Sequence, residues 1–376
     1  MRKLLAICLG TILFSSCMME HIGEQIISID INSCISAGGV SIYDICDKVE
    51  LIPLDDSVPI SNTVYDGIAN ITTDGQKIYL MDSRRYIINA YSLDGSLLIS
   101  THHVGRGPGE YTMASQIQYN SRLDLVEVLN PMGKILRYSC DSLKYVSELN
   151  LVGGPYAIHY FSSVDDNYIL YSHTNEEQLY LIPQNSLTSL SLGLDPPMYL
   201  RNYMSASSGI FMLYGRPCVF RPYDGLVLSI DIDGKCVKPL IEWDMGEYNC
   251  MLRDIPQYDN AREYGNFIMN YSQNHIAAFC SVNATDEWLF ATVIFKGEIY
   301  TLSYNLMDKT YKFFNRTKEG MRFLPELFHD NIMYKYVEST SLSDFVNRDV
   351  LDLESRKQYD AIMEHDGLAI IKYTLK

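Results

Sequence analysis

The sequence is poor in the features on which several common functional classes depend. Its 376 residues include 30 lysines and arginines against 46 aspartates and glutamates, which gives a formal net charge of −16. With so few basic residues there is no basic stripe to replace the counterions of a phosphate backbone, and this excludes nucleic acid as a partner. The same acidic balance argues against docking of the protein surface onto anionic lipid headgroups.

Signatures of enzymes and of metal sites are also missing. The chain has no GxSxG elbow, no HExxH pair, no Walker loop and no EF-hand spacing. None of its nine cysteines forms a CxxC pair or stands at zinc-finger spacing from histidines. These motifs therefore predict no metal site and no cofactor.

Seven cysteines remain when Cys8 and Cys17 are assigned to the leader described below. An odd number leaves at least one thiol free or paired between chains. We expect most of the seven to be buried as small apolar side chains. Cys218 and Cys236 could alternatively meet across one sheet.

A hydrophobic run long enough to cross a bilayer is absent at the N-terminus. The apolar residues 4–14 are too few, and they follow Arg2 and Lys3 as in a cleaved leader. Residues 1–16 resemble a bacterial lipoprotein signal peptide with Phe14-Ser15-Ser16-Cys17 as its lipobox. The resemblance implies cleavage before Cys17, diacylation of its thiol and acylation of the new amine. The alternative is an ordinary secretory signal with an incidental cysteine.

The leader predicts an anchored domain of about 360 residues. Residues 17–25 would be the lipidated tether and residues 26–376 the folded domain. Removal of residues 1–16 takes Arg2 and Lys3 away and changes the net charge from −16 to −18. Lipid chains would hold the protein on the bacterial outer membrane without a spanning helix, facing the periplasm or the cell surface.

The stretch 68–104 predicts a four-stranded antiparallel unit. Its strands are expected at 68–72, 77–81, 86–91 and 96–104, and Asp74-Gly75 and Asp94-Gly95 lie at two of the turns. Asp-Gly between apolar β-formers is a strong signal for a type I′ hairpin turn, which needs positive φ.

Five similar units follow at intervals of roughly 40 to 50 residues, the period of four-stranded propeller blades. The sequence therefore predicts an all-β fold, a six-bladed β-propeller. The positions that mark the second strand of each blade are Tyr79, Val126, Ile169, Val219, Leu289 and Met333.

Two stretches interrupt the β pattern with helical spacing. One lies within 248–271, with Asp259 or Asn260 as N-cap, and the other spans 342–364, begun by Ser343 or Asp344. Both are expected as short insertions into blades. Residues 49–54 should pair with the C-terminal strand, so that the two ends of the chain close the last blade and no sheet edge stays open.

The heptapeptide GRGPGEY, residues 105–111, follows the strands IYLMD and YSLDGSLL. In this arrangement the chain resembles the six-bladed β-propeller lipoproteins of Bacteroidetes, an NHL-like family of mostly unassigned function. The resemblance covers nearly the whole mature chain and implies an envelope lipoprotein with the propeller fold.

The same heptapeptide and the connection 82–85 should lie on one face of the propeller, near the mouth of its channel. They bring together the first candidate ligand-binding residues, which are Arg84, Arg85, Arg106, Glu110 and Tyr111. Binding residues concentrate on loops held by a rigid scaffold. The alternative is a structural corner in which the arginine and glutamate side chains bind the backbone between blades.

A second candidate group is Tyr199, Arg201 and Tyr203, in a chain that has 29 tyrosines. A phenol offers an apolar face with a polar tip, which suits stacking against sugars, although it also suits packing on a sheet.

The sequence therefore predicts a membrane-anchored envelope lipoprotein with a binding or scaffold role, whose ligand is a glycan or another envelope protein. The alternative is a metal-dependent hydrolase or lyase with its site in the central channel. That alternative requires three or more Asp, Glu, His or Asn side chains to converge there.

Overall fold

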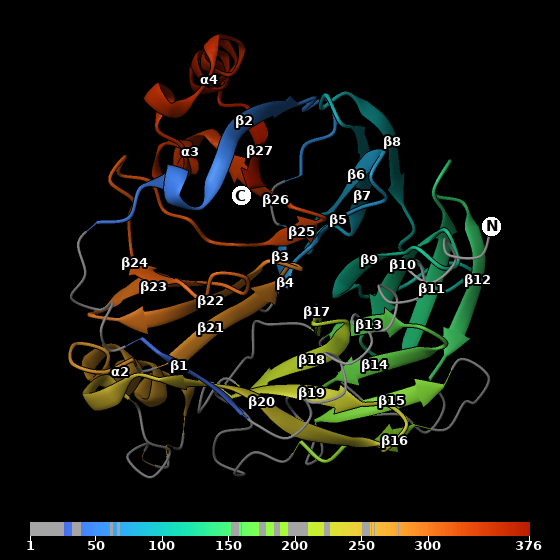
Figure 1. Cartoon of the computed structure of the whole chain (residues 1–376). Coiled ribbons are helices and arrows are strands. Elements are labelled where there is room, and N and C mark those ends of the chain that lie inside the picture. The colour runs from blue at the N-terminus through green and yellow to red at the C-terminus, as the bar shows by residue number, and fades with distance from the viewer. Residues whose placement is uncertain are drawn as a thin grey trace, which may run out of the picture.

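The computed structural model describes residues 26–31, 39–60, 63–65, 68–151, 158, 160–172, 178–183, 189–194, 210–221, 226–249, 256, 258, 260–276 and 278–376. In this part of the chain, six sheets of four or five strands stand around a common centre, and their innermost strands are β5, β9, β13, β17, β21 and β25 (Figure 1). The predicted six-bladed β-propeller is confirmed. None of the helices described is long and apolar enough to cross a membrane.

Blade one follows the predicted strand pattern closely, and its turns differ from the prediction in type. After the small hairpin β3 (Val64–Tyr65) and β4 (Ile68–Ala69) come β5 (Ile71–Thr73), β6 (Lys77–Met81), β7 (Ile87–Ser92) and β8 (Leu97–His102). Only the glycine of each Asp-Gly pair has positive φ, 83° at Gly75 and 92° at Gly95, whereas type I′ requires it at both central positions. Asp74 instead accepts hydrogen bonds from the amides of Gln76 and Lys77, at 2.8 and 2.6 Å. The loops are one or two residues longer than a type I′ turn allows.

Blades two to five keep the predicted order of four strands. The second-strand markers of all six blades are fully buried, because each lies between neighbouring sheets. The strands are β9 (Gln116–Asn120), β10 (Leu125–Asn130), β11 (Lys134–Ser139), β12 (Tyr145–Asn150), β13 (Tyr160–Val164), β14 (Asn167–Tyr171), β15 (Leu179–Pro183), β16 (Leu190–Ser191), β17 (Phe211–Leu213), β18 (Arg216–Arg221), β19 (Leu226–Asp231), β20 (Cys236–Asp244), β21 (Ala278–Ala284), β22 (Trp288–Phe295), β23 (Glu298–Asn305) and β24 (Tyr311–Phe314).

Blade six joins the two ends of the chain, as predicted. It consists of β25 (Leu327–His329), β26 (Ile332–Glu338), β27 (Leu368–Leu375) and, outermost, β2 (Cys46–Leu54). β2 pairs with β27 from Cys46 opposite Leu375 to Leu54 opposite Leu368. Just beyond β2, the amide of Asp55 donates to the Gly95 carbonyl at 2.9 Å, which ties blade six to blade one.

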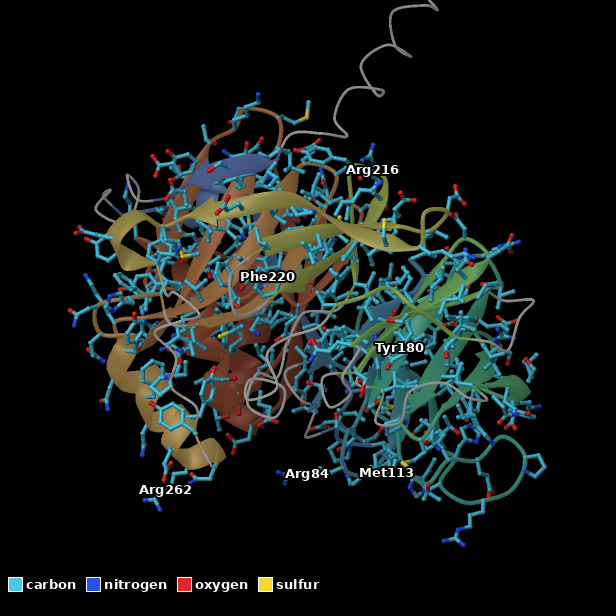
Figure 2. All side chains as sticks on the ribbon, turned by 90° about the horizontal axis from the view of Figure 1, so that it is seen from below. Arg84, Met113, Tyr180, Arg216, Phe220 and Arg262 are labelled. Carbon is cyan, nitrogen blue, oxygen red and sulfur yellow. The ribbon has the colours of Figure 1, made fainter. Side chains whose placement is uncertain are left out.

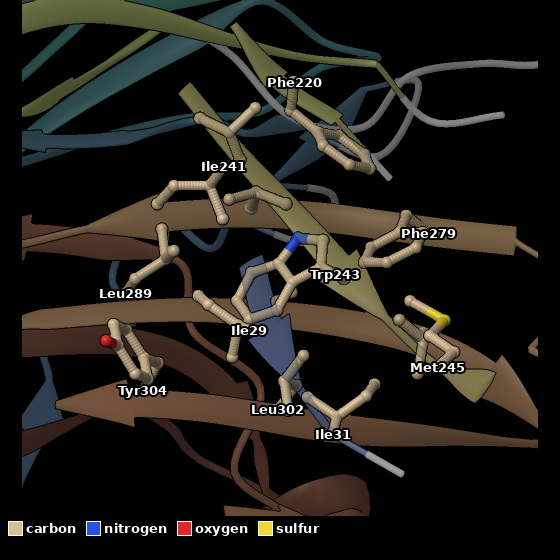
Figure 3. Packing of buried hydrophobic residues seen from close by; sticks show 14 of the residues in the cluster. Ile29, Ile31, Phe220, Ile241, Trp243, Met245, Phe279, Leu289, Leu302 and Tyr304 are labelled. Atoms are coloured by element: carbon tan, nitrogen blue, oxygen red, sulfur yellow. The ribbon is translucent and has the colours of Figure 1, made fainter. Parts of the chain in front are cut away.

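An extra strand, β1 (Ile27–Asp30), extends blade four and was not predicted. It runs parallel to β20, from Ile27 opposite Ile241 to Asp30 opposite Asp244, and makes that sheet five-stranded. Figure 3 shows Ile29 and Ile31 packed among side chains of blades four and five, and both are almost fully buried. The first strand described therefore belongs to the fourth blade.

Helices occupy both predicted insertions. α2 (Ala261–Tyr271) follows the short helix η3 (Gly246–Tyr248) and begins at Asn260, whose side chain accepts from the Glu263 amide at 3.0 Å, as predicted for an N-cap. The second insertion was predicted as one helix and forms three: α3 (Ser339–Phe345), η5 (Arg348–Val350) and α4 (Leu353–His365). Asn347 caps η5 and Asp352 caps α4, because short polar side chains at these positions compete for backbone amides and start new helices. A further short helix, η1 (Ile42–Asp44), precedes β2.

Alternating strand directions put the connections on two opposite faces of the ring. Figure 2 places Arg216, beside the first turn of blade four, on the side opposite Arg84, Met113 and Arg262. The helix face carries α2, α3, α4, the second-to-third strand connections and the links between blades. The turn face carries the connections between first and second and between third and fourth strands, at 74–76, 93–96, 121–124, 140–144, 165–166, 214–215, 232–235, 285–287, 306–310 and 330–331.

A buried ion pair within blade two is joined to blade three by a tyrosine hydroxyl. Glu127 has no exposed surface, and its Oε1 accepts from Arg137 Nε at 3.0 Å. The Tyr168 hydroxyl from blade three donates to the same oxygen, and Arg137 Nη2 donates to that hydroxyl at 2.6 Å. Asn120 Nδ2 donates to the second carboxylate oxygen at 3.1 Å.

The five cysteines in the described part of the chain are unpaired. Cys46, Cys140 and Cys218 are buried as expected, whereas Cys236 and Cys280 are partly exposed. Cys218 and Cys236 lie on strands separated by β19, so they do not meet. Burial raises the pKa of Cys140 to about 11 and that of Cys218 to about 12. Such thiols stay protonated near neutral pH and are poor nucleophiles. Cys34 and Cys250 lie outside the described residues.

Candidate functional site

The first strands of five blades enclose a hollow of about 740 Å³ at the centre of the ring. These strands are β5, β9, β17, β21 and β25, which surround the centre in Figure 1. The volume lies within the range of about 300–1,000 Å³ that is usual for small-molecule sites. The hollow is therefore large enough for a small-molecule ligand, and it lies at the centre of the ring.

Amide side chains line one wall of the hollow. Gln116 Oε1 accepts from the Phe161 amide at 2.7 Å and its Nε2 donates to the Phe161 carbonyl at 3.1 Å, which fixes β9 against β13. Gln118 Nε2 donates to Ser163 Oγ at 3.4 Å, while its Oε1 is buried without a hydrogen bond from the described residues. On the opposite wall lies a third amide, Asn283 of β21.

Hydroxyl and sulfur groups continue this lining. Ser281 Oγ and Thr292 Oγ1 lie 2.6 Å apart. Thr72 Oγ1 accepts from the Tyr119 amide at 3.0 Å, a bond that joins β5 to β9. Burial raises the pKa of Cys280 to about 11, so this thiol is neutral. These uncharged hydrogen-bonding groups share the lining with aliphatic side chains such as Ile71, Ile117 and Met212.

The charge of the hollow is compensated internally. Among the described lining residues, the only carboxylate, Glu326, binds the only lysine, Lys335. Glu326 Oε2 also accepts from the Tyr336 amide at 3.2 Å, and Lys335 Nζ lies 4.3 Å from the centre of the Phe345 ring. Both side chains are largely buried, so this pair stabilises the wall and leaves little net field for a charged ligand.

Three aromatic rings border the hollow, those of Tyr119, Phe211 and Phe328. Phe328 of β25 stacks on Phe290, with ring centres 5.5 Å apart and planes 6° from parallel. The hydroxyl of Tyr119 donates to Asp124 at 3.1 Å. The pKa of Tyr119 is raised to about 12, mainly by burial and to a smaller extent by this hydrogen bond. Such rings offer apolar faces beside polar tips.

The arrangement shows no donor set for a metal. Within the described residues, no group of three or more His, Cys, Asp or Glu side chains gathers anywhere, in the hollow or outside it. The convergent ligands that a metal-dependent hydrolase or lyase requires are therefore not assembled in this part of the chain.

The first group of sequence candidates lies on two connected segments outside the hollow. The Tyr111 hydroxyl donates to the Tyr86 carbonyl at 3.1 Å, which joins the loop 103–115 to the turn 82–86. Arg85 binds the fully buried Asp82 at 2.8 Å and donates to the Pro59 carbonyl. None of the five candidates, Arg84, Arg85, Arg106, Glu110 and Tyr111, lines the hollow.

The loop GRGPGEY forms a compact corner around its own glutamate. Glu110 Oε2 accepts from the Gly107 amide at 2.8 Å, and a Cβ at Gly105 would lie 1.9 Å from the same oxygen. Gly109, with φ of 75°, leaves room for the Tyr145 ring, which a Cβ would approach to 2.4 Å. Tyr111 is 1% exposed. These contacts support the structural alternative for the loop, while Arg84 and Arg106 are exposed.

The corner predicts unequal effects of two substitutions. Glu110→Ala should lower the free energy of unfolding by about 1 kcal/mol, because it removes the charged acceptor of the loop. Arg106→Ala should change it by less than about 0.5 kcal/mol, because the side chain is exposed. Denaturant unfolding monitored by fluorescence measures both, and equal effects would contradict the assignment of the corner to Glu110.

The second group of candidates, Tyr199, Arg201 and Tyr203, lies outside the described residues, as does the lipid-site candidate Cys17. Sequence reasoning missed the residues of the hollow. A signal was present, because polar residues alternate along the first strands: Gln116 with Gln118, and Ser281 with Asn283. Alternate residues share one face of a strand, and the innermost strand has one face on the channel.

Comparison with known proteins agrees with this architecture. Two solved structures share the fold. One is a Bacteroides fragilis protein inferred to be exported, which is 14% identical in sequence and has a TM-score of 0.71. The match covers 94% of this chain and 100% of that chain. The other is a Bacteroides vulgatus member of the DUF4221 family, with 10% identity, 88% and 97% covered, and a TM-score of 0.52.

At these identities the two structures support the fold alone, and no curated protein matches the chain in sequence. The family model described as 6-bladed beta-propeller, DUF5128, matches residues 21–325. That match spans most of the chain and includes the complete strands of five blades, so the protein belongs to the DUF5128 family of 6-bladed beta-propellers.

Proposed function

We propose that the protein is an outer-membrane lipoprotein, acylated at Cys17, that binds an uncharged polar ligand in its central hollow. The observation that carries the proposal is the hollow of about 740 Å³, lined by amide and hydroxyl groups, whose one lysine and one carboxylate neutralise each other. The envelope location is supported by the lipobox and by the fold relative from Bacteroides fragilis that is inferred to be exported.

A neutral glycan is the ligand class that fits this lining best. Sugar hydroxyls both donate and accept hydrogen bonds, so they can pair with the amide of Asn283, which lines the hollow. The C–H faces of a sugar ring pack against aromatic rings such as Phe328. An anionic ligand would find no uncompensated cation among the described lining residues. A protein of the envelope is the other occupant that the test below distinguishes.

Filling the hollow should abolish glycan binding without removing a structural contact. Met212 of β17 lines the hollow and is 47% exposed, so Met212→Trp adds volume there. We expect neutral oligosaccharides from xylan or starch to raise the melting temperature of the wild type, and Met212→Trp to lose this shift. Oligogalacturonates, which are anionic, should leave the melting temperature unchanged.

Met307→Trp is the matched control, because Met307 is 75% exposed in a turn outside the hollow. It should keep the full shift. Stabilisation by anionic glycans alone, or a shift that survives in Met212→Trp, would contradict the proposed site. If the wild type captures an envelope protein and no glycan changes its melting temperature, the ligand is a protein and not a glycan.

A further inference from the structure

The strand β1 determines where the N-terminal segment joins the propeller. β1 is hydrogen-bonded along β20 in parallel register, and the Ile31 amide donates to the Asp244 carbonyl at 2.9 Å. Ile29 and Ile31 are 2% and 0% exposed, between Trp243 of blade four and Leu302 of blade five (Figure 3). The first strand is therefore part of the core, and the chain before it leaves from a fixed point.

The chain before β1 approaches it from the side of the turn face. β1 runs in the same direction as β20, which leads from the turn 232–235 towards the helix face, and it pairs with the second half of that strand, with Ile27 opposite Ile241. Ile26, the first described residue, shares a surface hollow with Asp165, Arg216 and Asp233. Figure 2 shows Arg216 on the side of the molecule opposite Arg262 and Arg84.

The chain length sets how far the turn face can lie from a lipid at Cys17. Ile26 lies nine positions after Cys17, and a fully extended segment of that length spans about 30 Å. We propose that the turn face is the side of the protein that faces the membrane, and that the helix face is directed away from it. This orientation depends on the proposed acylation of Cys17.

The charge of the turn face opposes flat contact with an anionic membrane. The turns listed above for this face contain eleven acidic residues and four basic ones. Like charges repel over a Debye length of about 8 Å at physiological salt, which is much shorter than the tether. We therefore expect the turn face to lie near anionic headgroups without touching them, at a distance shorter than the extended tether. The acidic residues are Asp74, Asp94, Asp124, Asp141, Asp165, Asp166, Asp233, Asp286, Glu287, Asp308 and Asp330.

Energy transfer to the membrane surface tests the orientation. The full chain is produced in bacteria that acylate lipoproteins and is reconstituted into phosphatidylcholine vesicles that carry a headgroup acceptor dye. A donor is attached at a non-canonical residue replacing Asp233 or Arg262, both exposed and near opposite ends of β20. We expect transfer from position 233 to exceed transfer from position 262 at least twofold. Equal transfer, or more from position 262, overturns the orientation.

Two controls separate this inference from the anchor itself. Cys17→Ala should stay in solution, and a wild-type chain that does not bind vesicles overturns both the anchor and the orientation. Vesicle binding with equal transfer overturns the orientation alone. Ten Gly and Ser residues inserted after Glu24 should reduce energy transfer from both positions, and transfer from position 233 should still exceed that from position 262. The opposite ranking would contradict the proposal that the turn face is directed to the membrane.

Discussion

Glu127→Ala is expected to destabilise the propeller by about 3–5 kcal/mol, the cost of leaving a buried charge without its partner. The carboxylate has no exposed surface and accepts from three side chains, those of Asn120, Arg137 and Tyr168. Its removal leaves the Arg137 guanidinium, whose side chain is 18% exposed, without its carboxylate. The loss falls on the contact between blades two and three, so urea unfolding should show a lower midpoint.

The matched control is Glu148→Ala in the same blade. Glu148 pairs with Lys134 at 3.0 Å, but both side chains are partly exposed, and such pairs contribute at most about 1 kcal/mol. The double variant Glu127→Leu with Arg137→Leu should be less destabilised than Glu127→Leu, because no charge remains unpaired. A cost of Glu127→Ala no greater than that of Glu148→Ala would mean that the buried network contributes little to stability.

Gly95→Ala is expected to cost about 2–5 kcal/mol, the sum of backbone strain and overpacking. Gly95 has φ of 92°, and a Cβ there would lie 1.9 Å from the Pro53 carbonyl oxygen. That oxygen belongs to the backbone of β2 and cannot rotate away as a side chain could. The substitution should therefore displace the strand that closes blade six, and it is measured by the change in unfolding free energy.

Gly215→Ala supplies the comparison for Gly95. Gly215 has φ of 69°, and a Cβ there would meet nothing within 4 Å, so only the strain of about 1–2 kcal/mol applies. The difference between the two variants isolates the steric contact between blades six and one. If both variants lose the same stability, the contact of Gly95 with Pro53 does not hold the ring closed.

The blades could be predicted from the sequence because each is a local unit. Alternating apolar residues and short turns place all four strands of blade one within a stretch of 32 residues, and the same pattern recurs. Ring closure could also be predicted, since a propeller with a missing outer strand leaves an open edge that β2 can fill. The turn type at Asp74-Gly75 could not, because an Asp side chain that caps backbone amides competes with the type I′ geometry.

The features that escaped prediction depend on contacts between distant segments. β1 is a short stretch whose partner, β20, lies about 200 residues later, and the sequence contains no local signal for that pairing. The single helix predicted at 342–364 is divided, because Asn347 and Asp352 start new helices in positions that helical spacing alone does not reveal. The hollow is formed by five blades, so its lining emerges only when the ring is assembled.

The closure of blade six also has a consequence for biosynthesis. β2 lies near the beginning of the chain, yet β27, its hydrogen-bonded partner strand among the described residues, lies more than 300 residues later. Contacts between such remote segments form slowly, since much of the chain must be ordered before they meet. A chain that stops before β27 keeps the edges of β2 and β26 unpaired, and unpaired sheet edges are templates for pairing with other chains. Ring closure thus removes these edges, and it waits until β27 has been made.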